Sequence, residues 1–479
     1  MKTKTEFLNV RKSNKTKTML TDLYQLTMNA AYFDNNKDEM ATFDLFIRKL
    51  PNEWGFFIAN GIEDAIDYAT NIKFRKEDIE YLKQQKKFKP EFLESLKDFK
   101  FKGEIHAVKE GTPVFPNQPV MRITAKRTQA QFIETTLLNT INFQTMIATK
   151  ANRIVNAAGK AAVIDFGLRR ASGPDAGMLG ARAAYIGGAV GTSNVKAGME
   201  YKIPISGTHA HSFVMSFPTE LESFRAYVKT FPDNSTLLID TYDTAQGARN
   251  AAIVAKELEK KGHKLGAVRL DSGDLAILSK RVRFILDSEG LDYVKIVASN
   301  DLNEYKIDNL KQKGAKIDGY GVGTEMITAK PVSAISGVYK IVEDEEGPKI
   351  KLSPGKKTYP GKKQIYRFTS DEGFYMYDML TLEDEFEDGI PLLEQVVKDG
   401  KRVSPRRDLE EIRSYALNCV SKLPTHVKQL RASGHSYMVG ESFGLRNLVD
   451  KLSEQYEVKE QVVRKPYIET DSTYASQQT

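Results

Sequence analysis

The feature that most constrains this chain is a series of short apolar runs between residues 161 and 329, each ending in a polar cluster. The runs and their polar ends read AVIDFG (162–167), PISGTHAHS (204–212), TLLIDTYD (236–243), GAVRLDSGD (266–274), VKIVASND (294–301) and DGYGVGTE (318–325). Such runs are typical of strands buried on both faces of a parallel sheet. Segments of helical period, such as 244–262 and 274–290, separate several of them, so βα units are predicted. Because the strands of a βα barrel end at one shared mouth, we expect the active site there.

Segments of a different character flank this series. Residues 21–34 are predicted to form a helix, because a capping residue precedes apolar positions at helical spacing. Residues 104–125 carry turn-rich pairs typical of antiparallel strands, and 338–353 places an acidic Glu-Gly turn between two alternating strands. We therefore expect an α/β fold in three parts: an N-terminal α+β domain over 1–127, an α/β barrel with the active site over 128–345, and a C-terminal β-hairpin and helical portion over 346–479 that packs on the N-terminal domain.

Composition restricts the class of protein. A mean hydropathy of −0.42 and the lack of a long apolar run argue against a membrane span. A single cysteine, Cys419, leaves no intrachain disulfide or thiolate zinc site. The basic stretch 1–20 has no apolar core and does not read as a secretory signal, so we expect a cytoplasmic protein. The 70 basic side chains are offset by 63 acidic ones and no nucleic-acid-binding motif is found, so no nucleic-acid partner is expected.

The sharpest local cluster is GTHAHSF (207–213). Thr208 offers a hydroxyl and an amide, and His209 and His211 are expected on one face of a strand. Paired histidines can bind a metal, but no third ligand is obvious nearby. A single reactive imidazole is the preferred interpretation, since histidine acts as acid, base or nucleophile near neutral pH. Such an imidazole needs a partner on one nitrogen, which Asp240 or Asp243 in the next polar cluster could supply.

Two further strand ends carry groups suited to anions. RLDSGDL (269–275) places Arg269 beside Asp271, which suits an anionic ring next to a sugar diol. GYGVGTEM (319–326) offers the backbone N–H groups of Gly323 and Thr324, and the threonine hydroxyl, as a phosphate cradle. Neither a complete dinucleotide fingerprint nor a P-loop is present, so any use of ATP must follow a different design.

The stretch DFGLRRA (165–171) contains the DFG letters of protein kinases, but the other kinase motifs are missing. Phe166 is instead a candidate to stack on an aromatic ring. Arg169 and Arg170 follow it at a spacing suited to phosphate or pyrophosphate.

Seven motifs occur together and in order over about residues 20–435, and as a set they resemble nicotinate phosphoribosyltransferase. They read TDLYQLTM (21–28), FIRKLP (46–51), DFGLRRA, GTHAHSFV (207–214), RLDSGDL, SNDLNE (299–304) and GVGTEM (321–326). The resemblance implies an irregular α/β barrel of the type II phosphoribosyltransferase kind with an N-terminal domain, assembled as a homodimer with shared active sites. It also implies phosphoribosyl transfer from phosphoribosyl pyrophosphate to nicotinate, assisted by Mg²⁺ and driven by ATP through a phosphohistidine, as the first step of NAD synthesis from nicotinate.

The resemblance also implies roles for individual residues. His211 matches the phosphorylated histidine, with Asp240 as its orienting partner and Asp243 as a competitor; His209 receives no role. The implied nicotinate contacts are Tyr24 from the other subunit, Phe166, Thr208 and Arg269. The implied phosphoribosyl pyrophosphate contacts are Arg48, Arg169, Asp271, Asp301, Gly323 and Thr324. The resemblance identifies no Mg²⁺ ligands.

Other functions remain alternatives at the sequence level. A nicotinamide acceptor would favour an acidic side chain near the ring, whereas GTSNV (191–195) offers Ser193 and Asn194, which favours an acid substrate. A metal-dependent barrel aldolase or hydrolase would instead use His209, His211 and a carboxylate as ligands.

Overall fold

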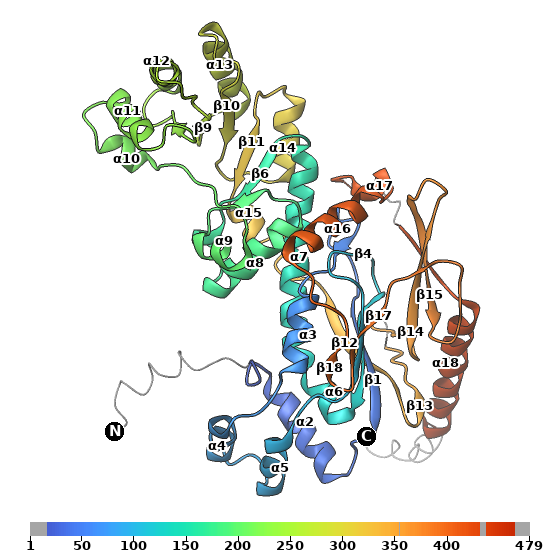
Figure 1. The fold of residues 1–479 in the computed structure, drawn as a ribbon. Helices are drawn as coiled ribbons and strands as arrows, with labels where there is room; N and C mark the ends of the chain where they lie inside the picture. Colours follow the sequence, from blue (N-terminus) through green and yellow to red (C-terminus); the bar gives the residue numbers. More distant parts are fainter. Residues whose placement is uncertain (1–16, 354, 432–436, 465–479) are drawn as a thin grey trace, which may run out of the picture.

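The computed structural model describes residues 17–353, 355–431 and 437–464. The basic N-terminal stretch before residue 17 and the polar tail after residue 464 lie outside these ranges. Figure 1 shows a parallel sheet with its helices at one end of the molecule and two further sheets at the other. Helix α7 (Glu134–Ala158) packs against elements of both ends. No helix within the described ranges combines the length and the apolar character needed to cross a bilayer.

The parallel sheet has six strands in the order β7-β6-β11-β10-β9-β8. Their bounds are β6 Ala162–Asp165, β7 Gly191–Thr192, β8 Thr236–Leu238, β9 Ala267–Leu270, β10 Lys295–Ala298 and β11 Gly319–Val322. Every pairing within this sheet is parallel. The connecting helices are α8 Pro174–Ile186, α9 Val195–Tyr201, α10 His211–Met215, α11 Glu220–Thr230, α12 Thr244–Glu259, α13 Leu275–Ser288, α14 Glu304–Gln312 and α15 Thr324–Ile327. The predicted βα series is therefore confirmed for five of its six apolar runs.

The exception is PISGTHAHS (204–212), which was expected to be a strand. It forms only an isolated bridge between Ile205 and Thr192, and His211 begins helix α10. Pro204 lacks an N–H for a strand ladder, and Gly207 weakens strand preference, so the segment runs as a loop. His209 and His211 therefore do not share a strand face, and the prediction that they do is wrong.

A seven-stranded sheet forms most of the N-terminal part, in the order β13-β12-β1-β5-β3-β17-β18. Its strands are β1 Met40–Ile47, β3 Glu104–Ala107, β5 Pro119–Lys126, β12 Gly337–Asp344, β13 Gly347–Pro348, β17 Glu394–Lys398 and β18 Lys401–Arg402. The predicted hairpin around the acidic turn is confirmed, with Asp344 opposite Gly347. Strand β12 pairs with β1, so the end of the expected barrel segment (128–345) belongs to this sheet.

Helices and a second, mixed sheet complete this part. The predicted N-terminal helix is confirmed as α2 (Leu23–Asp34). The other small elements are β2 Phe57–Ile58, α3 Ile62–Thr70, α4 Lys76–Gln84, α5 Pro90–Ser95, β4 Pro113–Val114 and α6 Arg127–Phe132. The C-terminal elements are β14 Lys363–Thr369, β15 Tyr375–Leu382, β16 Ile390–Pro391, α16 Leu409–Ser421, α17 Thr425–Lys428, β19 Met438–Glu441 and α18 Phe443–Arg464. Strands β16, β14, β15 and β19 form the second sheet.

A buried ion pair joins the two ends of the molecule. Arg182 on α8 donates through Nη1 to Glu110 Oε1 at 2.6 Å, to Asn60 Oδ1 at 3.0 Å and to Gln144 Oε1 at 2.9 Å. The Glu110 carboxylate also accepts the backbone N–H of Gly61 at 2.8 Å. Arg182 holds the pKa of Glu110 below its ordinary value even though burial acts in the opposite direction. Because removing either partner would leave a buried charge unpaired, this network fixes the barrel against the N-terminal part.

Candidate active site

A pocket of about 640 Å³ lies where several parallel strands end. Its walls come from the ends of β6, β7, β8 and β9 and from the loop before α10. The lining residues are Phe166, Leu168, Arg169, Ser193, Gly207, Thr208, His209, Ala210, His211, Leu238, Arg269 and Asp271. Six of them are residues singled out from the sequence as site candidates, and they are brought together from segments more than a hundred residues apart.

Arg269, on β9, is the best anchored cation of this pocket. Its Nη1 donates to Thr208 Oγ1 at 3.1 Å and its Nη2 to Asp271 Oδ1 at 2.9 Å. Its Nε donates to Ser299 Oγ at 2.9 Å, and the guanidinium lies 5.6 Å from the centre of the Phe166 ring. A planar cation held at three points beside an aromatic ring is suited to grip a carboxylate on a flat ligand.

Ser299 is a functional residue that the sequence interpretation left without a role. Its side chain is 3% exposed and its hydroxyl bridges Arg269 Nε and Asp271 Oδ1, the second at a very short separation. One hydroxyl thus orients both charged groups of the RLDSGDL cluster. Its place directly after strand β10, at the same sheet edge as Arg269, is the signal that could have identified it.

The position of Phe166 is set by the hydrogen bonds of the preceding residue, Asp165, and by the space above Gly321. The buried Asp165 carboxylate accepts the Gly167 N–H at 2.8 Å and the Thr192 hydroxyl at 2.7 Å, and burial raises its pKa. Any side chain at Gly321 would overlap the Phe166 ring, since a Cβ there would lie 2.4 Å from it. The glycine-spaced strand end GYGV is therefore needed to seat this ring.

His211 is the first residue of α10, and 40% of its side chain is exposed. Its Nδ1 lies 3.1 Å from Thr241 Oγ1, and its Nε2 lies 3.8 Å from Asp271 Oδ2. The imidazole therefore has a hydrogen-bond partner on one nitrogen only among the described residues, which leaves the other open to the pocket. Thr241 is thus the hydrogen-bond partner of His211, a role that was predicted for Asp240 or Asp243.

The two aspartates that were candidates to orient His211 have other partners. Asp240 Oδ2 accepts the backbone N–H of Asp271 at 2.7 Å and the Ser272 hydroxyl at 2.6 Å. Asp243 is the N-cap of α12 and accepts the Gln246 N–H at 2.7 Å. A carboxylate just before a helix satisfies free N–H groups of its first turn, which turns Asp243 away from the histidine.

His209 is a core residue, although it also borders the pocket. Its Nε2 accepts the Leu238 N–H at 3.2 Å, and its ring packs against Phe213 and Tyr227 at 5.3 and 4.7 Å. Burial lowers the pKa of His209 to about 4. The ring is therefore neutral at physiological pH.

This pKa leads to a stability prediction. The unfolded chain, with an ordinary histidine pKa near ~6.5, binds more protons than the folded chain between that value and 4, so stability falls as the pH is lowered. Between pH 7 and 4.5, His209 is expected to reduce the free energy of unfolding by roughly 2 kcal/mol. Urea unfolding at both pH values measures the change. The variant His209→Gln, which keeps a hydrogen-bond acceptor and does not titrate, should show a smaller loss; an equal loss would contradict the assignment.

The predicted phosphate groups lie on neighbouring strand ends. Arg169 borders the pocket from the 3-10 turn Leu168–Arg170 that follows β6. Gly323 and Thr324 follow β11, where α15 begins, and a Cβ on Gly323 would lie 3.1 Å from the Phe166 carbonyl oxygen. Asp301 follows β10 in a left-handed conformation, with φ of +44°, and is exposed.

Two further predicted site residues do not line this pocket. Tyr24 is on α2 with 45% of its surface exposed, and Figure 1 places α2 at the opposite end of the molecule from β9 and α10. Arg48 follows β1, and its Nε and Nη2 are buried without a hydrogen-bond partner among the described residues. Neither residue lines the pocket of its own chain.

Three family models match the chain, and together they cover most of it. Residues 19–142 match the nicotinate phosphoribosyltransferase N-terminal domain, 161–356 match the nicotinate phosphoribosyltransferase family, and 386–449 match the corresponding C-terminal domain. The chain belongs to the nicotinate phosphoribosyltransferase family. The family assignment made from the motifs is therefore confirmed.

Curated relatives in this family include enzymes from bacteria. The nicotinate phosphoribosyltransferase of Bacillus subtilis is 45% identical over 374 residues, which cover 76% of this chain and 76% of the relative. One from Mycobacterium tuberculosis is 39% identical over 425 residues, which cover 88% of this chain and 91% of the relative.

Solved structures support the same fold. Human nicotinic acid phosphoribosyltransferase aligns with a TM-score of 0.80 at 28% identity, covering 90% of this chain and 99% of that one. The nicotinate-nucleotide pyrophosphorylase of Pyrococcus furiosus aligns with a TM-score of 0.70 at 25% identity, covering 85% and 95%. The predicted α/β fold with N- and C-terminal portions around the barrel is confirmed.

Ser193 and Asn194, the two residues expected near the substrate ring, have different surroundings. Ser193 lines the pocket. Asn194, its predicted companion, is 2% exposed: its side chain accepts the Ala197 N–H at 3.1 Å and donates to the Gly177 carbonyl at 3.2 Å. Asn194 therefore caps helix α9, and of these two residues Ser193 alone borders the pocket.

The arrangement of the His, Cys, Asp and Glu side chains limits which metal ion the site could hold. No group of three or more His, Cys, Asp or Glu side chains within the described ranges is arranged to hold a metal, and His209 uses Nε2 for Leu238. The ligand set of a metal-dependent aldolase or hydrolase is thus not assembled. Asp240 Oδ1, in contrast, is a buried oxygen close to Asp271 that has no hydrogen-bond partner in the described part of the chain. Carboxylate oxygens completed by water and substrate phosphates suit Mg²⁺.

Proposed function

We propose that this protein transfers the phosphoribosyl group of phosphoribosyl pyrophosphate to nicotinate and forms nicotinate mononucleotide and pyrophosphate, the first step of NAD synthesis from nicotinate. The observation that carries the proposal is the arrangement of Arg269 beside Phe166 in a pocket at the strand ends. The names of the relatives, from Bacillus subtilis to human, support the same reaction.

In the proposed complex, the pyridine ring stacks on Phe166 and its carboxylate pairs with Arg269, near Thr208 and Ser193. The ring nitrogen attacks C1 of the ribose while the bond from C1 to pyrophosphate breaks. Because this transition state resembles an oxocarbenium ion, the protein contributes mainly by orienting the reactants and stabilising their charges. Asp271 holds ribose hydroxyls, and Arg169, Gly323 and Thr324 contact the phosphates. Asp301 is a further proposed contact of phosphoribosyl pyrophosphate.

Mg²⁺ fits the same site, with Asp240 Oδ1 and Asp271 as the proposed protein ligands. When bound, it would neutralise phosphate charge and so favour departure of pyrophosphate. In this proposal Asp240 would act on the phosphates through the bound Mg²⁺, and Thr241 orients His211.

ATP is the proposed co-substrate, and His211 its phosphoryl acceptor. Transfer of the γ-phosphoryl group to an imidazole nitrogen releases ADP, and later hydrolysis of the phosphohistidine releases phosphate. The half-exposed imidazole, with one nitrogen open to the pocket, supports this role. A phosphoryl group placed beside Asp271 adds negative charge close to the phosphate site, which offers a route from ATP hydrolysis to tighter substrate binding.

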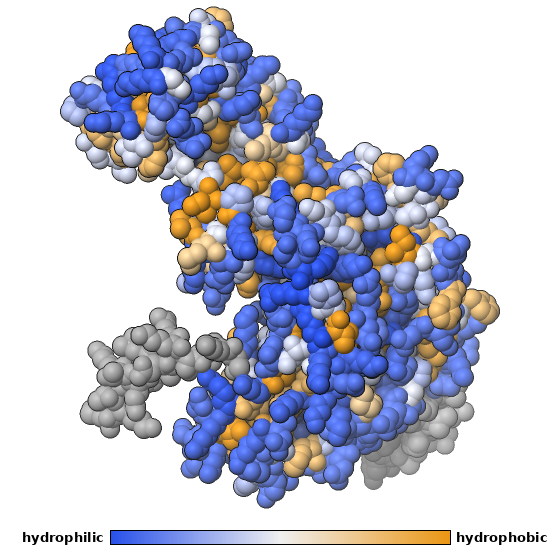
Figure 2. Space-filling model, viewed as in Figure 1, coloured by the Kyte–Doolittle hydropathy of each residue, from blue (hydrophilic) through white to orange (hydrophobic). Residues whose placement is uncertain are grey.

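A homodimer with shared active sites is proposed because Tyr24 and Arg48 do not line the pocket of their own chain. If both contact substrate, they must reach the pocket of a second copy. Exposed apolar side chains support an interface around α9: Val195 is 67% exposed, Met199 77% and Ile205 60%. Figure 2 shows apolar atoms gathered on this face of the molecule.

The deciding experiment is to incubate the protein with phosphoribosyl pyrophosphate and either nicotinate or nicotinamide, with and without MgATP, and to identify the nucleotide formed. The proposal expects nicotinate mononucleotide, formed faster with MgATP. Formation of nicotinamide mononucleotide at an equal rate would favour the nicotinamide alternative.

Arg269→Lys is expected to weaken nicotinate binding although the charge is retained. A lysine ammonium cannot reproduce two parallel hydrogen bonds to a carboxylate, nor the contacts with Thr208, Asp271 and Ser299. The expected loss is about 1–3 kcal/mol of binding free energy, measured as the nicotinate KM and by direct titration. Arg283→Lys, on the outer helix α13, is the control. Unchanged nicotinate affinity in Arg269→Lys would place the carboxylate contact elsewhere.

A further inference from the structure

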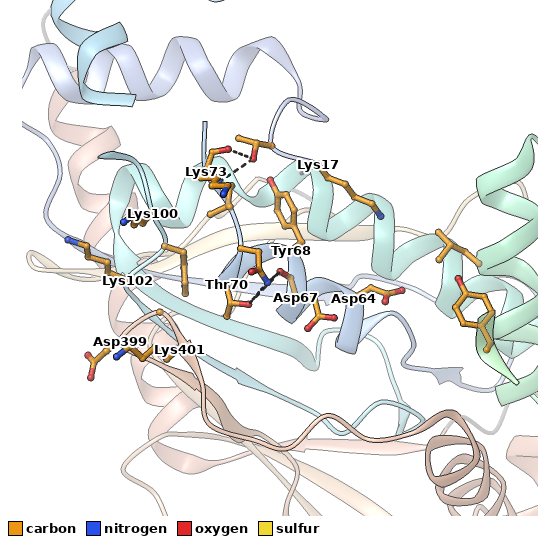
Figure 3. A pocket seen from close by; sticks show the side chains of 17 residues that line it. Lys17, Asp64, Asp67, Tyr68, Thr70, Lys73, Lys100, Lys102, Asp399 and Lys401 are labelled. Carbon is orange, nitrogen blue, oxygen red and sulfur yellow. Dashed lines mark hydrogen bonds between the residues drawn. The ribbon is translucent and has the colours of Figure 1, made fainter. Parts of the chain in front are cut away.

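A second cavity, of about 800 Å³, lies in the N-terminal part and shares no lining residue with the active-site pocket. Figure 3 shows it between helix α3, the turn at residues 17–20 and the turn between β17 and β18. Five lysines line it: Lys17, Lys73, Lys100, Lys102 and Lys401. Its other walls include Asp64, Asp67, Tyr68, Phe101, Tyr201 and Asp399.

Local backbone contacts build one end of this cavity. Gly400 has a φ of +72°, and a Cβ there would lie 2.1 Å from the Phe101 carbonyl oxygen, so only glycine fits. Its N–H donates to the Gly103 carbonyl at 2.9 Å. These contacts hold the β17–β18 turn against the segment before β3 and place Lys401 near Lys102, as Figure 3 shows.

The charges around the cavity do not balance. None of the five lysines forms an ion pair with a residue of the described ranges. Of the acids, Asp67 pairs with Arg402 at 3.3 Å, and Asp64 accepts Gln144 Nε2 at 2.8 Å and lies 3.9 Å from Arg406. Arg402 also pairs with Glu63, so the five lysines and these two arginines face four carboxylates, Asp399 included, which leaves a net charge of about +3. A concave surface with this excess attracts a multiply charged anion.

Aromatic groups line the same cavity. Tyr68 is only 9% exposed, and its hydroxyl is buried rather than open to the cavity. Tyr201 and Phe101 add aromatic wall, and burial raises the pKa of Tyr201 to about 12, so its hydroxyl stays protonated. Aromatic rings suit a flat base, while protonated hydroxyls can donate to ribose or phosphate oxygens.

We propose that this cavity is a second, non-catalytic site for a nucleoside polyphosphate, with the phosphates at Lys100, Lys102 and Lys401 and the base against the tyrosines. The volume lies within the usual range for small-molecule sites of about 300–1,000 Å³. Asp64, which lines the cavity, accepts a hydrogen bond from Gln144, and Gln144 accepts one from Arg182, so a nucleotide bound here lies next to the buried network that holds the barrel.

The test is equilibrium binding of adenylyl imidodiphosphate, a non-hydrolysable ATP analogue, to the full chain. The double variant Lys100→Gln/Lys102→Gln is expected to lose affinity at one site by about tenfold, in line with two exposed charges. Lys229→Gln/Lys313→Gln removes two exposed lysines elsewhere and should stay within about twofold of the unaltered protein. Arg269→Gln, which alters the active-site pocket, should retain the lysine-dependent site. Turnover without the analogue should be unchanged in both lysine variants.

Each other outcome overturns the proposal. Equal losses in both lysine pairs would indicate general charge attraction rather than a site. Binding that depends on Arg269 and not on Lys100 and Lys102 would place the nucleotide in the active-site pocket alone. Inorganic tripolyphosphate is the second probe: binding as tight as that of the analogue would show that the aromatic wall contributes nothing and would exclude the nucleotide class. The failure of phosphoribosyl transfer itself would leave these binding results unaffected.

Discussion

His211→Ala is expected to abolish the stimulation of turnover by ATP while leaving a slower, ATP-independent transfer of the phosphoribosyl group. The expectation rests on the half-exposed imidazole, whose Nδ1 is held 3.1 Å from Thr241 Oγ1 while its Nε2 faces Asp271. The groups expected to hold nicotinate, Arg269 and Phe166, do not depend on this imidazole, so basal transfer should survive.

Product formation and ATP hydrolysis should be measured together for this variant. His263→Ala is a suitable control, because His263 pairs with Asp233 on an outer loop and borders no part of the pocket. If His211→Ala still hydrolyses ATP in step with product formation, the phosphoryl acceptor must be a different residue. Thr241→Val should give a partial effect, since it removes the hydrogen bond that orients the imidazole and leaves the acceptor in place.

The sequence predicted the barrel strands well because their signal is local. Runs such as AVID and AVRL contain no exposed residue, and their buried and half-buried positions favour continuous apolar side chains. Since parallel strands all end at one edge, the polar residues that follow them had to meet. Arg269 and Asp271, at the end of β9, are therefore within hydrogen-bonding reach of Ser299, which follows β10 and is 30 residues from Arg269 in the chain.

The detailed contacts were less predictable because they depend on single turns. Asp240 and Thr241 are adjacent in the chain, yet the turn after β8 directs Asp240 to the Asp271 backbone and Thr241 to His211. Likewise, a proline and a glycine convert the predicted strand 204–212 into a loop, which moves His211 to a helix start and buries His209. Side-chain direction at such points is set by tertiary packing that no local pattern records.

Long-range placement was beyond the sequence altogether. The motif around Tyr24 carries no sign that α2 lies at the other end of the molecule from β9. The sequence likewise gives no sign that Nε and Nη2 of Arg48 are buried without a hydrogen-bond partner among the described residues. Buried nitrogens without partners are costly, and an anionic ligand shared with a second chain is one way to satisfy them.

Mixing two impaired variants is expected to restore activity if each active site draws on two chains. Tyr24→Ala should weaken nicotinate binding by roughly 0.5–1.5 kcal/mol beyond the loss of contact area, because an aromatic stack is removed. At low nicotinate, ATP-stimulated turnover should then be poor in Tyr24→Ala and absent in His211→Ala. A heterodimer of the two contains one site with both residues intact and one with neither. After full subunit exchange of equal amounts, about a quarter of all sites should be intact.

The control for this experiment mixes His211→Ala with Arg269→Ala, both of which alter the barrel pocket. Every site of that heterodimer carries one lesion, so no activity should return. Subunit exchange has to be measured independently, for example by mass spectrometry of differently tagged chains. If the subunits exchange and the Tyr24 mixture remains inactive, Tyr24 acts within its own chain or only packs on α2. Its 45% exposure on a helix far from its own pocket argues for a partner's pocket instead, since an exposed tyrosine contributes little to its own core.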